Sequence, residues 1–172
     1  MVNAASGTGS AVSSGELISI YGSNLGPASG WFNVPENNAY RNVAGYTRVL
    51  FDGRWYAPVL LATPNQINAF VPNVVQPGAT TTVQVEVDGV LSAPVVFNVA
   101  DAAFGLFTAN SSGSGQGAIL NPDGSYNSSS HPAERGSIVS LYGTGEGSTT
   151  PYYPIGALVL STPYPAPDNP EQ

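Results

Sequence analysis

The residues of this chain that could carry catalytic chemistry are few and lie far apart in the sequence. The single histidine, His131, would have to be the base of a serine hydrolase, but it lies in a loop-like run of serines and proline without a nucleophile elbow. Glu16, Glu86 and Asp88 could form a glycosidase pair if the fold brought two of them within about 5–9 Å. A solvated histidine and a solvated acidic hairpin end are the interpretations we favour, so we predict that the chain is not an enzyme.

A calcium loop is the next candidate, because Asp123 lies in a run of residues whose oxygens alternate along the chain. Pro122 and the lack of a distal glutamate argue against an EF-hand. The order Pro122-Asp123-Gly124 is that of a type I turn followed by a left-handed glycine. Cysteine is absent, which excludes disulfides, thiolate metal sites and a cysteine nucleophile. We therefore predict a plain turn, no metal site and no cofactor.

Flat aromatic side chains are the remaining residues that could bind a ligand, because pyranose rings stack on such faces. The candidates for a glycan platform are Trp31, Trp55, Tyr152 and Tyr153. The competing interpretation, which we favour, is that these side chains pack into a core or cover the edges of a sheet. Binding of a neutral polysaccharide is kept as the alternative function of the chain.

The charge of the chain limits its partners. The net charge is -7, from 11 acidic residues against four basic ones, and all four basic residues are arginines. Four basic residues are too few to form a cationic surface along a phosphate backbone or an anionic bilayer. Nucleic acid and membrane surfaces are therefore poor partners. No apolar run reaches the roughly 18 residues of a membrane span, and residues 1–6 do not resemble a signal peptide.

The elements that must position these residues are strands. The chain of 172 residues contains 20 Gly and 15 Pro between short runs rich in Val, Thr, Tyr and Phe, and no window has a helical period. Asp52-Gly53 and Asp88-Gly89 are strong hairpin signals, and Pro58 should lie at an edge or a bulge. Strands are predicted over residues 16–21, 47–51, 55–62, 66–71, 80–87 and 90–99. About nine or ten short strands without helices predict an all-β, immunoglobulin-like antiparallel β-sandwich, with an up-and-down barrel as the alternative.

A repeated segment organises the chain. Residues 15–26 return in similar form as residues 136–147, and both copies read as a largely buried strand that runs into a glycine turn. We therefore predict a sandwich domain over residues 1–135 and the start of a second, partial strand repeat over residues 136–172. That second copy would pair with the first domain or with a neighbouring chain. Its predicted assembly strand comprises Ala157, Leu158, Val159 and Leu160.

Several motifs, in register from Asn3 to about Pro151, resemble the C-terminal module abundant in Solibacter and related Acidobacteria. The motifs are Asn3-Ala4-Ala5-Ser6, the strand at residues 15–25, Pro64-Asn65-Gln66-Ile67-Asn68, Val71-Pro72, Gly105-Leu106-Phe107, Gly115-Gln116-Gly117-Ala118, Asn121-Pro122-Asp123-Gly124-Ser125, Arg135-Gly136 and Tyr142-Gly143-Thr144-Gly145-Glu146-Gly147. The resemblance implies IPT/TIG-type immunoglobulin-like domains at the end of large secreted or surface proteins, and it brings no catalytic residues. This chain departs from the family pattern at its end, where members continue through further strands.

These observations together predict a non-enzymatic structural or adhesion module of a secreted or cell-surface protein, in an extracellular location. The expected partners are further copies of the chain or other extracellular β domains, with polysaccharide as the alternative. Sharing of the strand at residues 157–160 between subunits would build filaments if the contact repeated head to tail.

Overall fold

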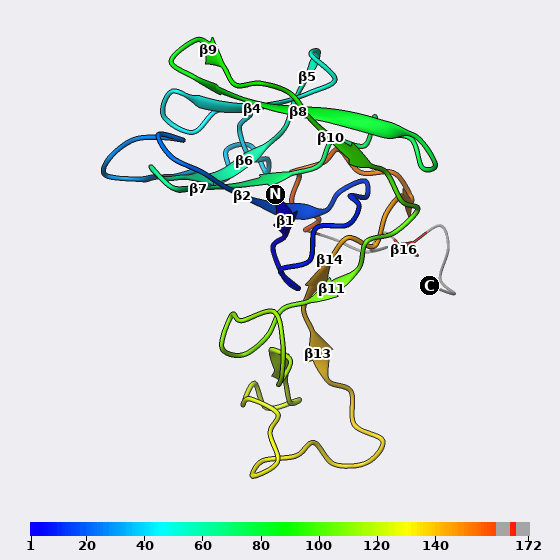
Figure 1. The fold of residues 1–172 in the computed structure, drawn as a ribbon. Coiled ribbons are helices and arrows are strands. Elements are labelled where there is room, and N and C mark those ends of the chain that lie inside the picture. The colour runs from blue at the N-terminus through cyan, green and yellow to red at the C-terminus, as the bar shows by residue number, and fades with distance from the viewer. Residues whose placement is uncertain (161–165, 168–172) are drawn as a thin grey trace.

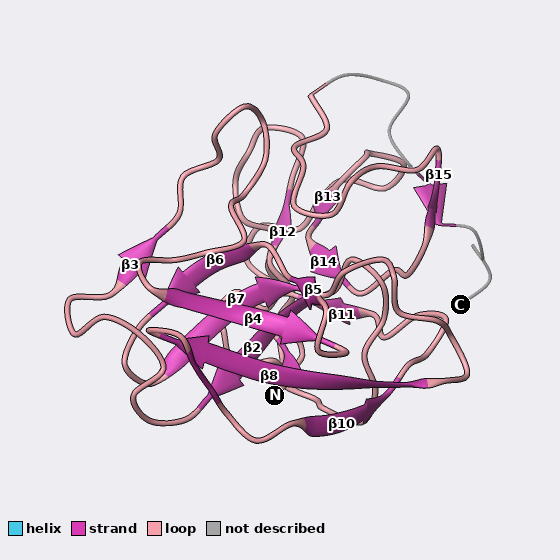
Figure 2. Ribbon diagram, turned by 90° about the horizontal axis from the view of Figure 1, so that it is seen from above, coloured by secondary structure: helices cyan, strands magenta, loops and turns pink. Residues whose placement is uncertain are grey.

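A computed structural model of the chain describes residues 1–160 and 166–167. The described residues form short β-strands and no helix, so the all-β prediction is confirmed (Figures 1 and 2). Among these residues there is accordingly no helix long and apolar enough to cross a membrane.

Two antiparallel sheets face each other across the larger part of the molecule (Figure 2). The first sheet has the order β1 (Val2–Asn3), β2 (Leu17–Tyr21), β7 (Gln66–Phe70), β6 (Val59–Ala62) and β3 (Trp31–Phe32). The second has the order β10 (Val95–Asn98), β8 (Thr80–Val87), β4 (Thr47–Phe51) and β5 (Trp55–Tyr56), and β9 (Val90–Leu91) also pairs with β8. The arrangement is that of a β-sandwich, as the turn spacing predicted.

The hydrophobic core lies between the two sheets and takes side chains from both. Ile18 and Ile67 enter it from the first sheet, and Val49, Phe51 and Val83 enter it from the second. In β8 the inward positions are buried and the alternate ones are more exposed, which follows from the two-residue period of a strand.

Both predicted Asp-Gly hairpins are present. Asp52, Gly53 and Arg54 join β4 to β5, with φ of 51° and 62° at the first two residues, and Asp88 and Gly89 join β8 to β9 with φ of 49° and 79°. Two successive left-handed residues are the type I′ geometry, whose twist matches that of the flanking strands.

The single strand predicted over residues 55–62 is wrong, because the structure splits it into β5 and β6. β5 pairs with β4 in the second sheet, and β6 pairs with β7 in the first. The chain crosses between sheets at Ala57 and Pro58, where the proline cannot donate a ladder hydrogen bond. A bulge follows between Val59 and Leu61. The predicted strand 90–99 is likewise divided, into β9 and β10.

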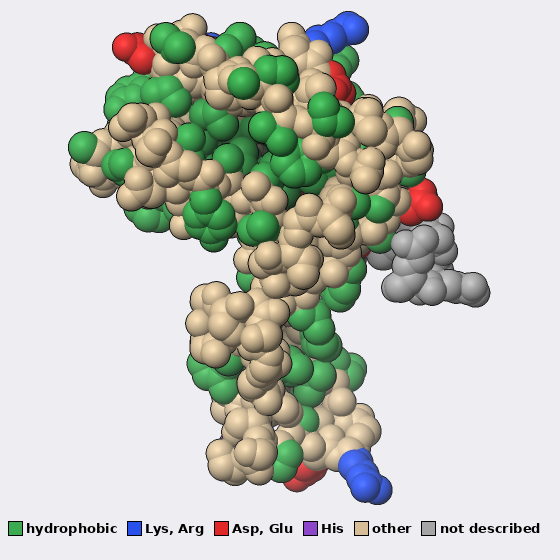
Figure 3. Space-filling model, in the orientation of Figure 1, with side chains coloured by type: hydrophobic (Ala, Val, Ile, Leu, Met, Phe, Trp, Pro, Cys, Tyr) green, Lys and Arg blue, Asp and Glu red, His purple; other side chains and the backbone are tan. Residues whose placement is uncertain are grey.

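A smaller lobe, formed by residues 105–144, projects from one end of the sandwich (Figures 1 and 3). Its two short ladders pair β11 (Gly105–Leu106) with β14 (Gly143–Thr144) and β12 (Ile119–Leu120) with β13 (Ser140–Leu141). The predicted domain boundary at residue 135 therefore falls inside the lobe, with paired strands on either side of it. The chain then returns to the sandwich, where β15 (Thr149–Thr150) pairs with β16 (Ala166–Pro167).

Polar contacts fasten the base of the lobe to the sandwich. The amide of Asn3 donates to the carbonyl of Ala103 at 2.8 Å, and the backbone N–H of Leu17 donates to the hydroxyl of Thr144 at 2.7 Å. Gly145 has φ of 85°, and a Cβ there would lie 2.2 Å from the Ala103 carbonyl oxygen. The repeated segment therefore ends in glycine at this junction because the backbones approach too closely for a side chain.

Candidate functional site

The predicted assembly strand, residues 157–160, lies against the chain's own sandwich. Ala157 forms a bridge to Ala39, and the N–H of Leu158 donates to the carbonyl of Asn38 at 2.7 Å. One residue earlier, the carbonyl of Gly156 accepts from the N–H of Tyr40 at 2.9 Å. The backbone of residues 156–158 is thus hydrogen-bonded along one edge to residues 38–40 of the same chain.

The two predicted tryptophans lie on separate sheet edges and do not form a platform. Trp31 is on β3, at the edge of the first sheet, and its indole N–H donates to Asn33 Oδ1 at 3.0 Å. Trp55 is on β5, at the edge of the second sheet, and the Arg54 guanidinium stacks over its ring at 4.6 Å from the centroid. Both positions fit the edge-covering role rather than a shared ligand site.

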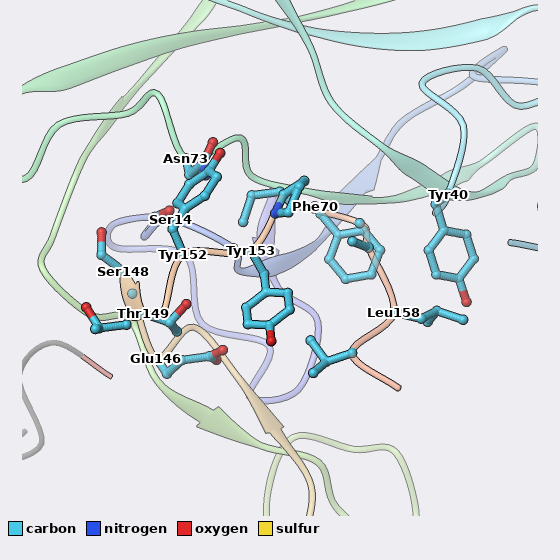
Figure 4. A pocket seen from close by; sticks show the side chains of 18 residues that line it. Ser14, Tyr40, Phe70, Asn73, Glu146, Ser148, Thr149, Tyr152, Tyr153 and Leu158 are labelled. Carbon is cyan, nitrogen blue, oxygen red and sulfur yellow. The ribbon is translucent and has the colours of Figure 1, made fainter. Parts of the chain in front are cut away.

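The two predicted tyrosines, in contrast, line one groove of about 720 Å³ (Figure 4). The returning segment, residues 146–159, forms most of its wall, and Phe70 of β7 contributes from the sandwich. In Figure 4, Tyr153 lies between Tyr152 on one side and Tyr40 on the other. The rings of Tyr40 and Phe70 pack against each other with centroids 5.7 Å apart, so the groove has an aromatic patch from the sandwich as well.

Asn73, just after β7, places an amide at this groove. Its Nδ2 atom is buried and has no hydrogen-bond partner among the described residues. Glu146 is the one charged residue among the described side chains that line the groove, and apart from the Asn73 amide the rest are hydroxyl, apolar or aromatic. The sequence analysis did not name Phe70 or Asn73 as groove residues. The signal for Phe70 was its position as an outward-facing aromatic residue at the end of an alternating strand.

The candidate catalytic residues Glu86 and His131 lie in different parts of the fold, the first on β8 of the sandwich and the second in the lobe. Glu86 accepts a hydrogen bond from Tyr56 Oη at 2.9 Å and pairs with Arg48 at 3.4 Å, so it is engaged on the outer face of the second sheet. His131 and Asp123 both line a smaller cavity of about 340 Å³ in the lobe. The described residues hold no group of three or more His, Cys, Asp or Glu side chains placed to bind a metal ion.

Asp123 forms the predicted turn. Its carboxylate accepts hydrogen bonds from the N–H and the hydroxyl of Ser125 at 3.0 and 2.7 Å. These two bonds to Ser125 lower the pKa of the Asp123 carboxyl. The side chain therefore stabilises its own loop, and the predicted turn with a left-handed glycine is present, with φ of 82° at Gly124.

Glu16 is the unusual titratable group of the molecule. It lies at the base of the lobe with no solvent exposure, and one oxygen accepts a hydrogen bond from the Ser13 N–H at 2.8 Å. The other oxygen, Oε1, is buried with no hydrogen-bond partner among the described residues. Burial raises the pKa of Glu16 from 4.5 to about 7, although hydrogen bonds from Ser13 and Asn3 act in the opposite direction.

The second copy of the repeated strand has a different environment from the first. Ile18 in the first copy is fully buried, whereas its counterpart Val139 in the second is only half-buried. Ile138 and Leu141, the counterparts of the half-buried Leu17 and Ile20, are 87% and 54% exposed. Tyr142 is also exposed, and hydrophobic side chains are visible on the surface of the lobe in Figure 3. The same local pattern therefore forms a core strand in the sandwich and an exposed strand in the lobe.

No family model, curated protein or solved structure matches this chain.

Proposed function

We propose that this chain is a non-enzymatic structural or adhesion module of a secreted or cell-surface protein, with an immunoglobulin-like sandwich of the IPT/TIG kind. In constant-type immunoglobulin domains, strands A to G divide into one sheet ordered A-B-E-D and another ordered C-F-G. Seven strands of this chain can be lettered A to G in chain order: β1, β2, β4, β6, β7, β8 and β10. With these letters the first sheet, β1-β2-β7-β6, has the order A-B-E-D, and the second, β4-β8-β10, has the order C-F-G. This strand order supports the proposed kind of sandwich.

The exposed strand of the lobe carries the functional part of the proposal. Ile138, just before β13, and Leu141, in β13, are apolar side chains whose counterparts in β2, Leu17 and Ile20, are half-buried, yet here they face solvent. A strand with exposed apolar residues is a template for contact with another β element. We therefore place association with other β domains at the lobe, and a second copy of this chain is the partner to test first.

The proposed location outside the cell rests on the family resemblance and on composition. The chain has no lysine, no cysteine and few charges overall, and it is rich in small polar residues. An extracellular module with these properties would act as a spacer or a contact surface of a larger protein. A contact between the lobe of one copy and a different surface of the next would repeat head to tail and build a filament.

The experiment is sedimentation velocity of the purified chain over a range of concentrations, with negative-stain microscopy of the same samples. Self-association should appear as a rising sedimentation coefficient. Replacing Ile138 and Leu141 together by Asp should abolish it, because the variant places two charges on the proposed contact. The substituted side chains are exposed, so folding should be unchanged.

The matched control is Val34→Asp, which places a charge on a residue 75% exposed in a loop of the sandwich. This variant should associate like the parent chain. A parent chain that stays monomeric up to submillimolar concentration would contradict self-association through the lobe, as would equal loss of association in the Val34 control.

A further inference from the structure

We propose that the groove between residues 146–159 and the outer face of the first sheet binds a neutral oligosaccharide. The groove is lined by aromatic rings, hydroxyl groups and a single carboxylate. This inference concerns a different surface from the exposed strand of the lobe, so it does not rest on the proposed association.

The aromatic residues provide faces for sugar rings. Tyr152 is 69% exposed, and the Tyr40–Phe70 pair supplies a second aromatic patch in the same groove (Figure 4). An aromatic ring carries negative charge density on its face, and the C–H bonds on one side of a pyranose ring are weakly positive and apolar. Two aromatic patches in one groove suit a chain of sugar units better than a single small molecule.

The polar groups fit hydroxyl-bearing ligands. The groove is lined by the hydroxyl groups of Ser148 and Thr149 and by the carboxylate of Glu146. A sugar hydroxyl can donate to the carboxylate and can both donate to and accept from the protein hydroxyls, because a hydroxyl both donates and accepts. A purely apolar ligand would make none of these hydrogen bonds.

The charge of the groove selects against ionic ligands. None of the four arginines lines it, and Glu146 is its one charged residue within the described part of the chain. A phosphate, sulfate or uronate would therefore meet a carboxylate without a compensating cation. A single exposed carboxylate is also too little to select a cationic ligand, so a neutral polyhydroxy compound remains the best chemical fit.

The size of the groove is suitable as well. Its volume of about 720 Å³ lies within the range of about 300–1,000 Å³ typical of small-ligand sites. Its walls come from the sandwich on one side and from the returning segment on the other, and Figure 4 shows side chains from both around the space. The alignment of Tyr152, Tyr153 and Tyr40 gives the ligand several successive contacts.

The experiment is calorimetric titration of the chain with neutral hexasaccharides of glucose, xylose and mannose, and with a hexagalacturonate for comparison. At least one neutral sugar should bind, and the hexagalacturonate should bind more weakly. Tyr152→Ala should weaken binding about tenfold, as expected when an aromatic anchor is truncated, whereas Tyr152→Trp should retain it.

Tyr126→Ala is the matched control, because Tyr126 is 68% exposed and lies in the lobe, outside the groove. It should bind the sugar as the parent chain does, and so should the lobe variant carrying Asp at 138 and 141. The absence of binding to every neutral hexasaccharide would overturn the proposal. Equal weakening by Tyr126→Ala, or preference for the hexagalacturonate or for a proline-rich peptide, would do so too.

Discussion

Replacement of Glu16 by Gln should stabilise the folded chain at neutral and alkaline pH. Glu16 has no solvent exposure, and its Oε1 atom has no hydrogen-bond partner among the described residues. Its ionised form is therefore held without the solvation that water gives it in the unfolded chain. Gln has the same shape and keeps a carbonyl oxygen for the N–H of Ser13, which donates at 2.8 Å.

The size of the effect follows from the pKa. Glu16 has a pKa of about 7 in the folded chain against 4.5 for the ordinary group, so the folded state binds more protons than the unfolded state between those two values. The free energy of unfolding must therefore fall as pH rises from about 4.5 to about 7, and the loss is complete above the folded pKa. With about 1.4 kcal/mol for each pH unit between the two pKa values, the total loss is about 3 kcal/mol.

The assay is urea unfolding, followed by circular dichroism, at several pH values from 4.5 to 8.5. The parent chain should lose about 3 kcal/mol over that range, and Glu16→Gln should remove most of the slope and be the more stable protein at pH 8.5. Glu134→Gln is the control, since Glu134 is an exposed carboxylate of the lobe and should not change the slope. A slope that survives in Glu16→Gln, or a parent chain with no slope, would refute the reasoning.

Two further predictions concern packing, and both are measured by the same unfolding assay. Phe51→Ala should cost about 3–5 kcal/mol because the ring is fully buried between the sheets, whereas Phe32→Ala, at an exposed edge position, should cost less than 1 kcal/mol. Gly145→Ala should destabilise the chain more than Gly53→Ala, although both residues have positive φ. The added Cβ would lie 2.2 Å from the Ala103 carbonyl oxygen in the first case and would meet nothing within 4 Å in the second.

The hairpins of this protein could be predicted because their chemistry is local. A type I′ turn needs two left-handed residues, and Asp-Gly supplies them at both Asp52-Gly53 and Asp88-Gly89 without reference to the rest of the fold. The alternation of β8 was predictable for the same reason, since the buried and exposed residues follow the period of one strand.

The crossing between sheets at Ala57 and Pro58 was not predictable from the residues alone. Most residues from Trp55 to Ala62 are compatible with a strand. Pro58 signals an interruption, but it does not indicate that the chain changes partner there. Which sheet β6 joins depends on β7 and β3, which lie on either side of it. That choice is made by tertiary packing, and local propensity carries no information about it.

The groove could also be predicted only in part from the sequence. Tyr152 and Tyr153 could be named from the sequence because exposed aromatics are recognisable as candidate ligand contacts. Phe70 and Asn73 could not be placed beside them, because they are more than 70 residues away in the chain and meet the returning segment only through the tertiary fold. Trp31 and Trp55 satisfied the same sequence criterion and lie on separate sheet edges. The aromatic residues of the sequence therefore indicated that a binding platform could exist, but they did not identify which rings lie together.

The repeated segment gives the clearest physical lesson about this chain. Both copies have the alternation of a strand and the glycines of a tight turn, and the second copy does form short strands, β13 and β14. Burial, however, depends on what faces the strand: β2 has β1 and β7 beside it and a second sheet over it, whereas β13 is paired with β12 among the described residues. Local sequence determines that a strand forms, and its neighbours determine whether its apolar side chains become a core or a contact surface.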